Sequence, residues 1–426
     1  MASSPPDSQT GVQANSGLLS RIASEFSFIR GNFLLLIVSW LFMDFASEMP
    51  ATYYGKYVEA LGGSAATVGL IGFASMASQA LVQFPGGYLA DKYGRRWLIS
   101  TMTFGVALSY AFYAFAPNWQ TIMIGAVVSS LCLIYSPALT AIIMDSLPLE
   151  RRGMGFSIIN LITGVSTTPA PLIAGWLLTK YGLVPSMRMG YTFVVAMYLA
   201  AAVLRLRLKE TLKETRRING RELLRTYPRS IVESVRVWKV VPRSAFILFI
   251  TGIVTMFSFS LFQPVLLFWV LDDLGISEVS WAFILTVLFV SMIGLAIPCG
   301  KLIDKIGKKK PLLLAYLLLF LLVPLFIYGD FYKLLFAMPM VGMMQVLFNA
   351  ASSALNADLV PQEHRGKIVG SSRFFTLVAA SLGQLTGGFM YDNVSHSMPF
   401  LIQVVFILPS LLLTLFFIKE PKKKEE

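Results

Sequence analysis

The chain has 426 residues, of which 56% are hydrophobic and 14% are charged, and its formal net charge is +12. Soluble domains average about 25% charged residues, so this composition excludes an ordinary set of soluble domains. Long apolar runs recur along the chain, each close to the roughly 20 residues with which an α-helix crosses a bilayer. A barrel would show short alternating strands instead, and an open sheet cannot satisfy its backbone in hydrocarbon. We therefore expect an all-α membrane protein.

The apolar runs predict twelve transmembrane helices in two groups of six. The first group covers 32–54, 65–90, 95–116, 119–144, 153–180 and 187–207. The second group covers 244–271, 278–303, 311–329, 332–357, 366–391 and 397–418. The expected organisation is a disordered N-terminal tail (1–30), a six-helix bundle (31–208), a basic central loop (209–242), a second six-helix bundle (243–418) and a charged C-terminal tail (419–426).

The central loop leaves two interpretations open. Ile231, Val235 and Trp238 recur at helical spacing within its polar sequence. That pattern fits an amphipathic helix on the membrane surface, and it equally fits a solvated linker that contains some helix.

Basic residues lie mostly on one side of the predicted spans. Only Lys56, Lys180, Arg188 and Lys333 fall on the other side, so 31 of the 35 lysines and arginines share one side. Cytoplasmic loops carry such an excess, which predicts cytoplasmic termini and a cytoplasmic central loop in a multi-pass protein of the plasma membrane. Because the charges follow topology and form no patch, no nucleic-acid partner is expected.

The chain contains an internal repeat. The loop 87–96, Gly-Tyr-Leu-Ala-Asp-Lys-Tyr-Gly-Arg-Arg, recurs as 300–309, Gly-Lys-Leu-Ile-Asp-Lys-Ile-Gly-Lys-Lys, and the numbering advances by 213 from Gly87 to Gly300. A second motif, Asp-x-x-Pro-x-Glu-x-Arg-Gly, begins at Asp145 and again at Asp358, with the same advance in numbering. We call this common spacing the repeat offset. The two halves are therefore a duplication.

These duplicated loops resemble the signature of the major facilitator superfamily, and the resemblance covers about 30 to 418. It implies two pseudo-symmetric six-helix bundles that move a small solute across a bilayer by alternating access. We expect a transporter rather than an enzyme, and a monomer without cofactor or metal. Its expected partners are the solute, protons and the lipid bilayer.

The duplicated loops supply the candidate gating residues. Gly94 and Gly307 are expected to adopt the positive φ of a tight turn, and Gly87 and Gly300 to allow close helix approach. The resemblance implies that the charged members form a cluster in each half, which latches the cytoplasmic side and breaks when the halves rock. Alternatively, these charges only enforce topology and cap helix ends. The charged candidates are Asp91, Arg95, Asp145 and Arg152 in the first half and Asp304, Lys308, Asp358 and Arg365 in the second.

Two carboxylates in the first helix are the leading site candidates. Asp44 lies about twelve residues into that helix, roughly 18 Å along it and near mid-bilayer, and Glu48 follows on the same face. Repulsion and desolvation favour protonation of at least one of them, as a proton carrier requires. At the repeat offset stand Phe257 and Leu261, so the acidic residues are one-sided. The alternative is that Glu48, two residues before Pro50, is simply hydrated in an outer vestibule.

The resemblance to the superfamily implies that an acid in the first helix serves proton coupling or cation recognition, as it does in several of its drug exporters.

Arg373 lies in the eleventh helix, either snorkelling to the inner interface or pairing with a substrate or carboxylate. Most other polar groups in the spans are expected only to tie helices together. The further candidates for the cavity are Trp40, Gln79, Tyr135, Ser166, Thr167, Gln345, Asn349 and Gln384.

Two family motifs are absent or degraded. The superfamily's proton antiporters usually carry a buried arginine in the fourth helix, where this chain has Gly125. The antiporter motif of the fifth helix is reduced to Pro171 and Gly175, although Pro169 and Pro171 should still weaken the helix backbone and allow a bend. Export is therefore favoured only weakly over import.

The resulting prediction is a proton-linked exporter of a small amphipathic or cationic organic solute, of multidrug type. Its rival within transport is a symporter or facilitator for a nutrient such as a sugar or organic ion. A membrane sensor on a transporter scaffold is the alternative of another class, and the sequence lacks the Walker, HExxH and Gly-x-Ser-x-Gly motifs of an ATP-driven pump or a hydrolase.

Overall fold

The computed structural model describes residues 28–92, 94–148, 151–212, 228, 231–232, 235–360 and 365–420, without the side chains of 152, 153, 156 and 365. The helices of the first half are α2 (Gly31–Ala51), α3 (Tyr54–Ala60), α4 (Ala65–Lys92), α5 (Arg95–Ala114), α6 (Trp119–Cys132), η1 (Leu133–Tyr135), α7 (Ser136–Ser146), α8 (Arg152–Thr167), α9 (Ala170–Tyr181) and α10 (Leu183–Arg205). Those that follow are η3 (Val237–Lys239), α12 (Arg243–Phe262), α13 (Leu266–Phe268), η4 (Trp269–Asp273), α14 (Glu278–Ile306), α15 (Lys309–Ile327), α16 (Phe331–Leu359), α17 (Arg365–Asn393) and α18 (Met398–Phe417).

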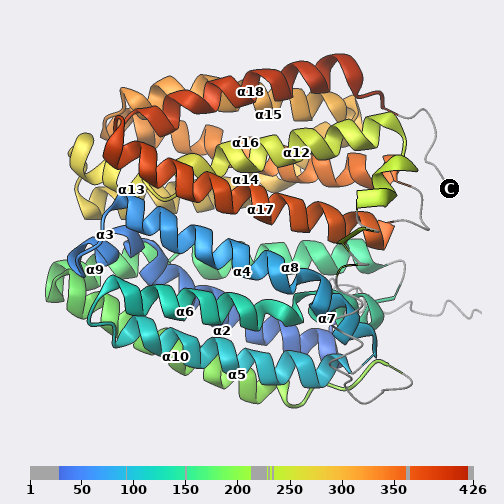
Figure 1. Cartoon of the computed structure of the whole chain (residues 1–426), viewed down its shortest axis with the longest axis horizontal. Coiled ribbons are helices and arrows are strands. Elements are labelled where there is room, and N and C mark those ends of the chain that lie inside the picture. The colour runs from blue at the N-terminus through green and yellow to red at the C-terminus, as the bar shows by residue number, and fades with distance from the viewer. Residues whose placement is uncertain are drawn as a thin grey trace, which may run out of the picture.

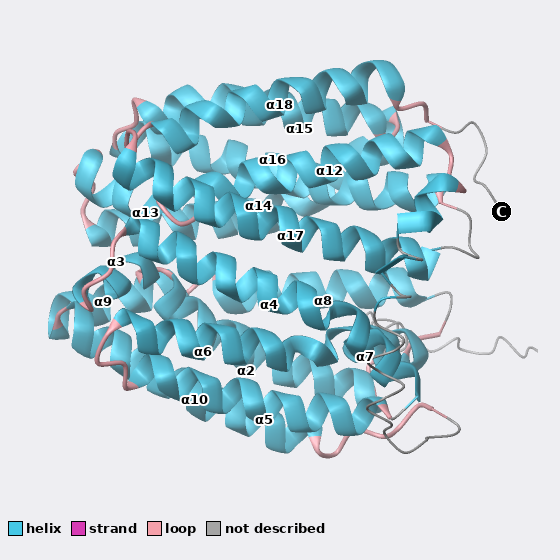
Figure 2. Cartoon of the chain, in the orientation of Figure 1, coloured by secondary structure: helices cyan, strands magenta, loops and turns pink. Residues whose placement is uncertain are grey.

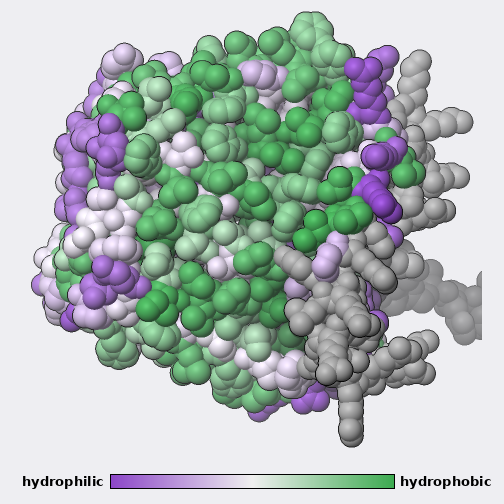
Figure 3. All heavy atoms as spheres, viewed as in Figure 1, coloured by the Kyte–Doolittle hydropathy of each residue, from purple (hydrophilic) through white to green (hydrophobic). Residues whose placement is uncertain are grey.

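Helices form because every backbone polar group in a membrane must be satisfied within its own segment. Figure 2 shows only helices and loops in the described part of the chain. Twelve spans there are long and apolar enough to cross a membrane, which confirms the predicted fold class. Figure 3 shows hydrophobic side chains in a broad band around the middle of the molecule, with hydrophilic residues gathered toward the ends.

The two halves form two neighbouring bundles. In Figure 1 the blue and green helices α2 to α10 lie together, and the yellow to red helices α12 to α18 lie beside them. We call the end of the molecule at which α2 begins and α18 ends the inner end, and the opposite end the outer end. Asn32 at the start of α2 exchanges two hydrogen bonds with the backbone of Lys209, 2.7 and 2.8 Å long, so the first half also ends at the inner end.

The described helices match the predicted spans closely except at two equivalent places. The first span was expected to reach 54 and the seventh 271, but α2 ends at Ala51 and α12 at Phe262. Pro50 and Pro264 stand near these ends, and proline removes a backbone donor and disrupts the helix ladder. The chain continues as the short helices α3, α13 and η4. In the fifth span the helix is interrupted where proline was expected to weaken it, because α8 ends at Thr167 and α9 begins at Ala170, on either side of Pro169.

The halves touch where small residues let helices approach closely. A Cβ atom added to Gly69 of α4 would lie 2.4 Å from the backbone oxygen of Gln384 in α17, and one added to Gly388 would lie 3.1 Å from the Cα of Gly69. A second close contact between the halves lies where α9 meets α14. There a Cβ on Gly175 of α9 would lie 3.2 Å from the Cβ of Ala282 in α14. Gly175 and Gly388, like Gly69 and Ala282, are separated by the repeat offset. The duplication therefore extends to the contacts between the halves.

The central loop joins the second half through a buried tryptophan. Trp238 in η3 is 8% exposed, stacks on Phe249 with ring centroids 3.8 Å apart, and donates a 2.8 Å hydrogen bond to Ser371 of α17. Its ring therefore packs within the protein and is not a membrane-surface anchor. Most of the loop, and the tails before 28 and after 420, lie outside the described residues.

Candidate functional site

Asp44 lies inside the first bundle and reaches the fifth span. It stands thirteen residues after Gly31, about 20 Å along α2. Its Oδ2 accepts a 2.8 Å hydrogen bond from the hydroxyl of Thr163 in α8. Glu48 follows one turn later, half-buried like Asp44, and no described residue donates a hydrogen bond to its carboxylate. The predicted pair of carboxylates therefore shares one helix face, with only Asp44 held by a side chain of another span.

A buried arginine, which sequence analysis missed, occupies the same bundle. Arg205 ends α10 and is 0% exposed. Its guanidinium donates hydrogen bonds to Ser39 (3.0 Å), Thr103 (3.0 Å) and the Tyr135 hydroxyl (3.4 Å), and Nη2 is buried without a partner. Among the described residues no ion pair joins it to Asp44, whose carboxylate bonds Thr163. A buried charge is costly unless it is compensated, which makes Arg205, like Asp44, a candidate functional residue of the first half.

The other predicted polar residues are spread over both halves. Tyr135 lies under Arg205, with the guanidinium carbon 5.7 Å from its ring centroid. Gln384 is buried and donates a 2.6 Å hydrogen bond to Gln263, while Gln345 lines a cavity in the second half. Arg373 is exposed and pairs with no carboxylate of the described residues, so its role stays a prediction. Of the rest, Trp40 and Gln79 are half-buried, Asn349 is exposed, and Ser166 and Thr167 are buried with hydrogen bonds to backbone oxygens of α8.

At the inner end, each half contains one ion pair between its duplicated motifs. Arg95 pairs with Asp145, and Lys308 pairs with Asp358, and the two pairs are separated by the repeat offset. These are the pairs that the family resemblance implied. Within the described ranges no ion pair joins Asp91 or Asp304 to them, so each expected trio is a pair. The side chains of Arg152 and Arg365 lie outside what the structure describes.

The glycines of the motifs behave differently from one another. Gly94 and Gly307 have φ angles of 104° and 86°, which confirms the predicted turn conformation. The expectation that Gly87 and Gly300 allow close helix approach was wrong, because a Cβ atom at either position would meet open space.

A glutamate that sequence analysis missed caps each inner turn. Glu210 accepts a 2.9 Å hydrogen bond from the backbone N–H of Arg96, and Glu420 accepts one of 2.8 Å from that of Lys308. Burial alone would raise the pKa of Glu210, but the N–H groups of Leu212, Arg96 and Thr211 hold its pKa below the ordinary value. A Lys-Glu pair recurs at 209–210 and 419–420, and this repeat is the signal that could have indicated the caps.

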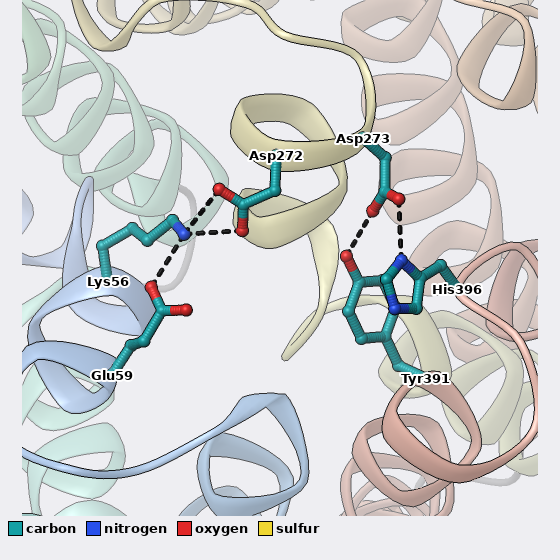
Figure 4. A network of polar contacts seen from close by, with 6 residues as sticks. All are labelled: Lys56, Glu59, Asp272, Asp273, Tyr391 and His396. Atoms are coloured by element: carbon teal, nitrogen blue, oxygen red, sulfur yellow. Dashed lines mark hydrogen bonds and ion pairs between the residues drawn. The ribbon is translucent and has the colours of Figure 1, made fainter.

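At the outer end, Lys56 joins the halves. Its Nζ lies 2.7 Å from Glu59 of its own half and 2.6 Å from Asp272 of the other half (Figure 4). Glu59 and Asp272 are equivalent by the repeat offset, so one lysine bridges the same acid of both halves. Burial alone would lower the pKa of Lys56, but its hydrogen bonds to Asp272 and Glu59 and their charges raise it. The lysine therefore stays charged near neutral pH.

Further contacts hold the outer end together. The Tyr53 hydroxyl donates a 2.7 Å hydrogen bond to the backbone oxygen of Glu278, and the Ala66 N–H donates one of 2.8 Å to Asp392. Both contacts cross between the halves. Beside them, Asp273 bonds Tyr391 and His396 of the second half, the latter at 2.7 Å (Figure 4). With the close glycine crossings, these contacts close the outer end.

Comparison with known proteins identifies the family. The model of the Major Facilitator Superfamily matches residues 32–263 and 248–426. The chain belongs to the major facilitator superfamily. It is therefore a multi-pass membrane transporter and not an enzyme, as the motifs predicted.

Relatives and a solved structure within the superfamily are similar at low identity. Multidrug resistance protein MdtG of Citrobacter koseri is 25% identical over 383 residues, 86% of this chain and 89% of MdtG. Multi-drug resistance efflux pump PmrA of Streptococcus pneumoniae serotype 4 is 27% identical over 273 residues, 61% of this chain and 63% of PmrA, just under two thirds of that relative. The crystal structure of a point mutant of nucleoside transporter NupG superposes with a TM-score of 0.69 at 16% identity, covering 90% of this chain and 99% of NupG; at that identity the likeness shows the fold alone.

Proposed function

We propose that this transporter exports a small amphipathic or cationic organic solute in exchange for protons, with Asp44 and Glu48 carrying the proton or the cation. The observation that carries the proposal is the carboxylate of Asp44, which lies deep in a span and bonds Thr163 of the neighbouring span. Intramembrane carboxylates are rare, costly and tied to function. Two relatives named as multidrug resistance or efflux proteins support the solute class and the direction.

A route from proton to movement follows from the contact of Asp44. Ionised Asp44 accepts the Thr163 hydroxyl, and protonation removes the charge that strengthens this bond. Gly164, the next residue of α8, faces α14 of the other half, where an added Cβ would lie 3.1 Å from Ile293. The protonation state of Asp44 therefore acts on a helix that packs against the opposite half. Arg205 compensates the ionised form.

The two ends then act as alternating gates. The Lys56 bridge closes the outer end in this structure, and it must open for solute to leave there. At the inner end, Arg95 and Lys308 stay paired with aspartates of their own halves while the outer end is closed, so in this proposal the two pairs hold the helices of each half together as the halves rock. Cytoplasmic placement of the inner end in the plasma membrane follows from the basic residues gathered there.

The proposal is tested by proton flux in proteoliposomes. A panel of lipophilic cations and sugars is added to vesicles that contain wild type, Asp44→Asn or Asp330→Asn, and a trapped pH-sensitive dye reports proton movement. Asp330 is an exposed carboxylate in an outer loop, so Asp330→Asn is a matched control. We expect cation-dependent flux in wild type and the control and none in Asp44→Asn. Solute movement without proton flux, with an unaffected Asp44→Asn, would leave a facilitator; coupling to a sugar would favour nutrient symport.

A further inference from the structure

A cavity of about 180 Å³ lies inside the second bundle, away from Asp44. Its walls come from α12, α13, α14, α15, α16 and α18 and are mostly aliphatic and aromatic, with Trp281 and Phe400 among them. No ionisable residue lines it. An apolar cavity of about 150 Å³ holds a benzene molecule, so this one accommodates a single aromatic ring with small substituents.

Three glutamines line the cavity, namely Gln263, Gln345 and Gln403. Gln403 is 4% exposed, and the amides of Gln345 and Gln403 have no hydrogen-bond partner among the residues that the structure describes. Neither amide is among the polar atoms that are wholly buried without a partner, so both reach open space rather than the packed interior. Two free amides therefore face the cavity, and each can both donate and accept a hydrogen bond.

The equivalent place in the first half is filled by larger side chains. Val323 and Phe326 line the cavity at positions equivalent to Tyr110 and Tyr113 by the repeat offset. In the first half these two tyrosines pack together with ring centroids 5.4 Å apart, and Tyr113 lies 4.9 Å from Tyr191. The first half thus fills with tyrosine rings a place that the second half leaves open. Departures of one copy from its repeat are expected where that copy has a function of its own.

The cavity is connected to the contact between the halves. Gln263 is exposed and marks the open side of the cavity, and its Oε1 accepts the 2.6 Å hydrogen bond from Gln384. Gln384 packs directly on α4 of the other half, where a Cβ atom added to Gly72 would lie 2.6 Å from its Oε1. A ligand that bonds Gln263 therefore competes with Gln384, a residue of the closed outer crossing.

We propose that this cavity binds an uncharged, single-ring aromatic compound that carries one amide-like hydrogen-bonding group. The ring packs against the apolar wall, and Gln345 and Gln403 form hydrogen bonds with the polar group. A ligand that also bonds Gln263 displaces Gln384 and so weakens the contact of Gln384 with α4. The site goes beyond the proposed proton-linked export, since binding here needs neither Asp44 nor a proton.

The test uses the full chain in lipid nanodiscs and 4-iodobenzamide as the probe. Trp281 is 3% exposed and lines the cavity, so the iodine of a bound probe quenches its fluorescence. We expect saturable quenching that disappears in Trp281→Phe. Val323→Tyr, which copies the first half, should weaken binding at least tenfold, whereas Leu321→Tyr on the exposed face of the same helix should not change it. Quenching that does not saturate, or that is equal in Val323→Tyr and wild type, overturns the site.

Volume-conserving variants keep the test independent of folding defects. Gln403→Met should weaken binding about fivefold, the effect of one lost hydrogen bond. Gln384→Met should instead tighten it about threefold, because it frees Gln263. Weaker binding in both variants would overturn the competition between ligand and Gln384. Asp44→Asn should bind the probe with wild-type affinity, so failure of proton coupling and failure of this site give different results.

Discussion

Arg95 pairs with Asp145 at the inner end of the first half, and Lys308 pairs with Asp358 at the equivalent place in the second. The interiors of the two halves differ. Where the first half has its charged residues Asp44, Glu48 and Arg205, the second has Phe257, Leu261 and Ile418, all at the repeat offset. Where the first half packs tyrosine rings, the second leaves a cavity.

This difference separates scaffold from chemistry. We propose that the features both halves keep, the inner ion pairs and the helix crossings, serve the movement of one half against the other. The features that only one half has, the buried charges and the cavity, are those to which we assign proton coupling and ligand binding. Variants at both kinds of feature can be tested. The largest effect on transport is expected from the buried charge, and the smallest effect on stability from the exposed ion pairs.

The largest effect is expected from Arg205→Met. It removes the positive charge to which we assign the compensation of ionised Asp44, so we expect transport driven by a pH gradient to fall at least tenfold. Arg207→Met, two residues away and exposed, is the matched control and should transport normally. Solute flux into proteoliposomes at equal protein content measures the change. Normal flux in Arg205→Met would show that the first half needs no buried cation and would remove this difference between the halves.

The second prediction makes the two helix crossings alike. Gly69→Ala places a methyl group where Ala282 already has one, but only 2.4 Å from the backbone of α17. The clash should shift the outer end toward its open state about fivefold. Spin labels at Ala60 and Val394 measure the distance between the two halves at the outer end. They are placed in a background with Cys132→Ala and Cys299→Ala, so that no native cysteine is labelled. Gly87→Ala, which meets no atom within 4 Å, should leave the distance distribution unchanged; equal distributions in all variants would contradict the role of close packing.

The third prediction concerns the acids that Lys56 bridges. Asp272→Asn removes the contact between the halves and should raise the outer-open population about threefold, in the range of a partly exposed ion pair. Glu59→Gln changes the equivalent acid but leaves the contact between the halves intact, so its effect should be smaller. The same spin labels measure both. A larger effect of Glu59→Gln would show that the bridge to Asp272 does not hold the outer end.

The smallest effect is expected for the inner pairs. The carboxylate of Asp358 is 13% exposed and that of Asp145 is 42% exposed, so water screens the pair of the first half more strongly. Asp358→Asn should lower the melting temperature of the purified protein by about 2–4 °C, and Asp145→Asn by less. Thermal unfolding monitored by intrinsic fluorescence ranks the two variants. The reverse order would mean that exposure does not decide the strength of these pairs.

Sequence predicted the twelve spans and the duplication, because apolar length and a repeated motif are local signals. The pairing of Arg95 with Asp145 was implied by the resemblance to the superfamily. It missed the broken ends of the first and seventh spans, since Pro50 and Pro264 stand near the ends of apolar runs that continue beyond them.

Arg205 and the cavity could not be found in the same way. An arginine in the last turn of a span is an ordinary topological charge, and only the fold turns this one inward toward Ser39 and Thr103. A cavity depends on how side chains of six helices fill a common space, and no single helix carries that information. In both cases the repeat offers a signal, because Ile418 and Val323 differ in kind from their equivalents Arg205 and Tyr110.

The most direct test of one-sided coupling compares exchange with accumulation in Asp44→Asn proteoliposomes. Exchange of labelled for unlabelled solute needs no net proton movement, whereas accumulation against a gradient needs a proton to be carried in return. We predict that Asp44→Asn keeps exchange and loses accumulation driven by a pH gradient. Accumulation at the wild-type level in Asp44→Asn would contradict the assignment of proton coupling to the first half.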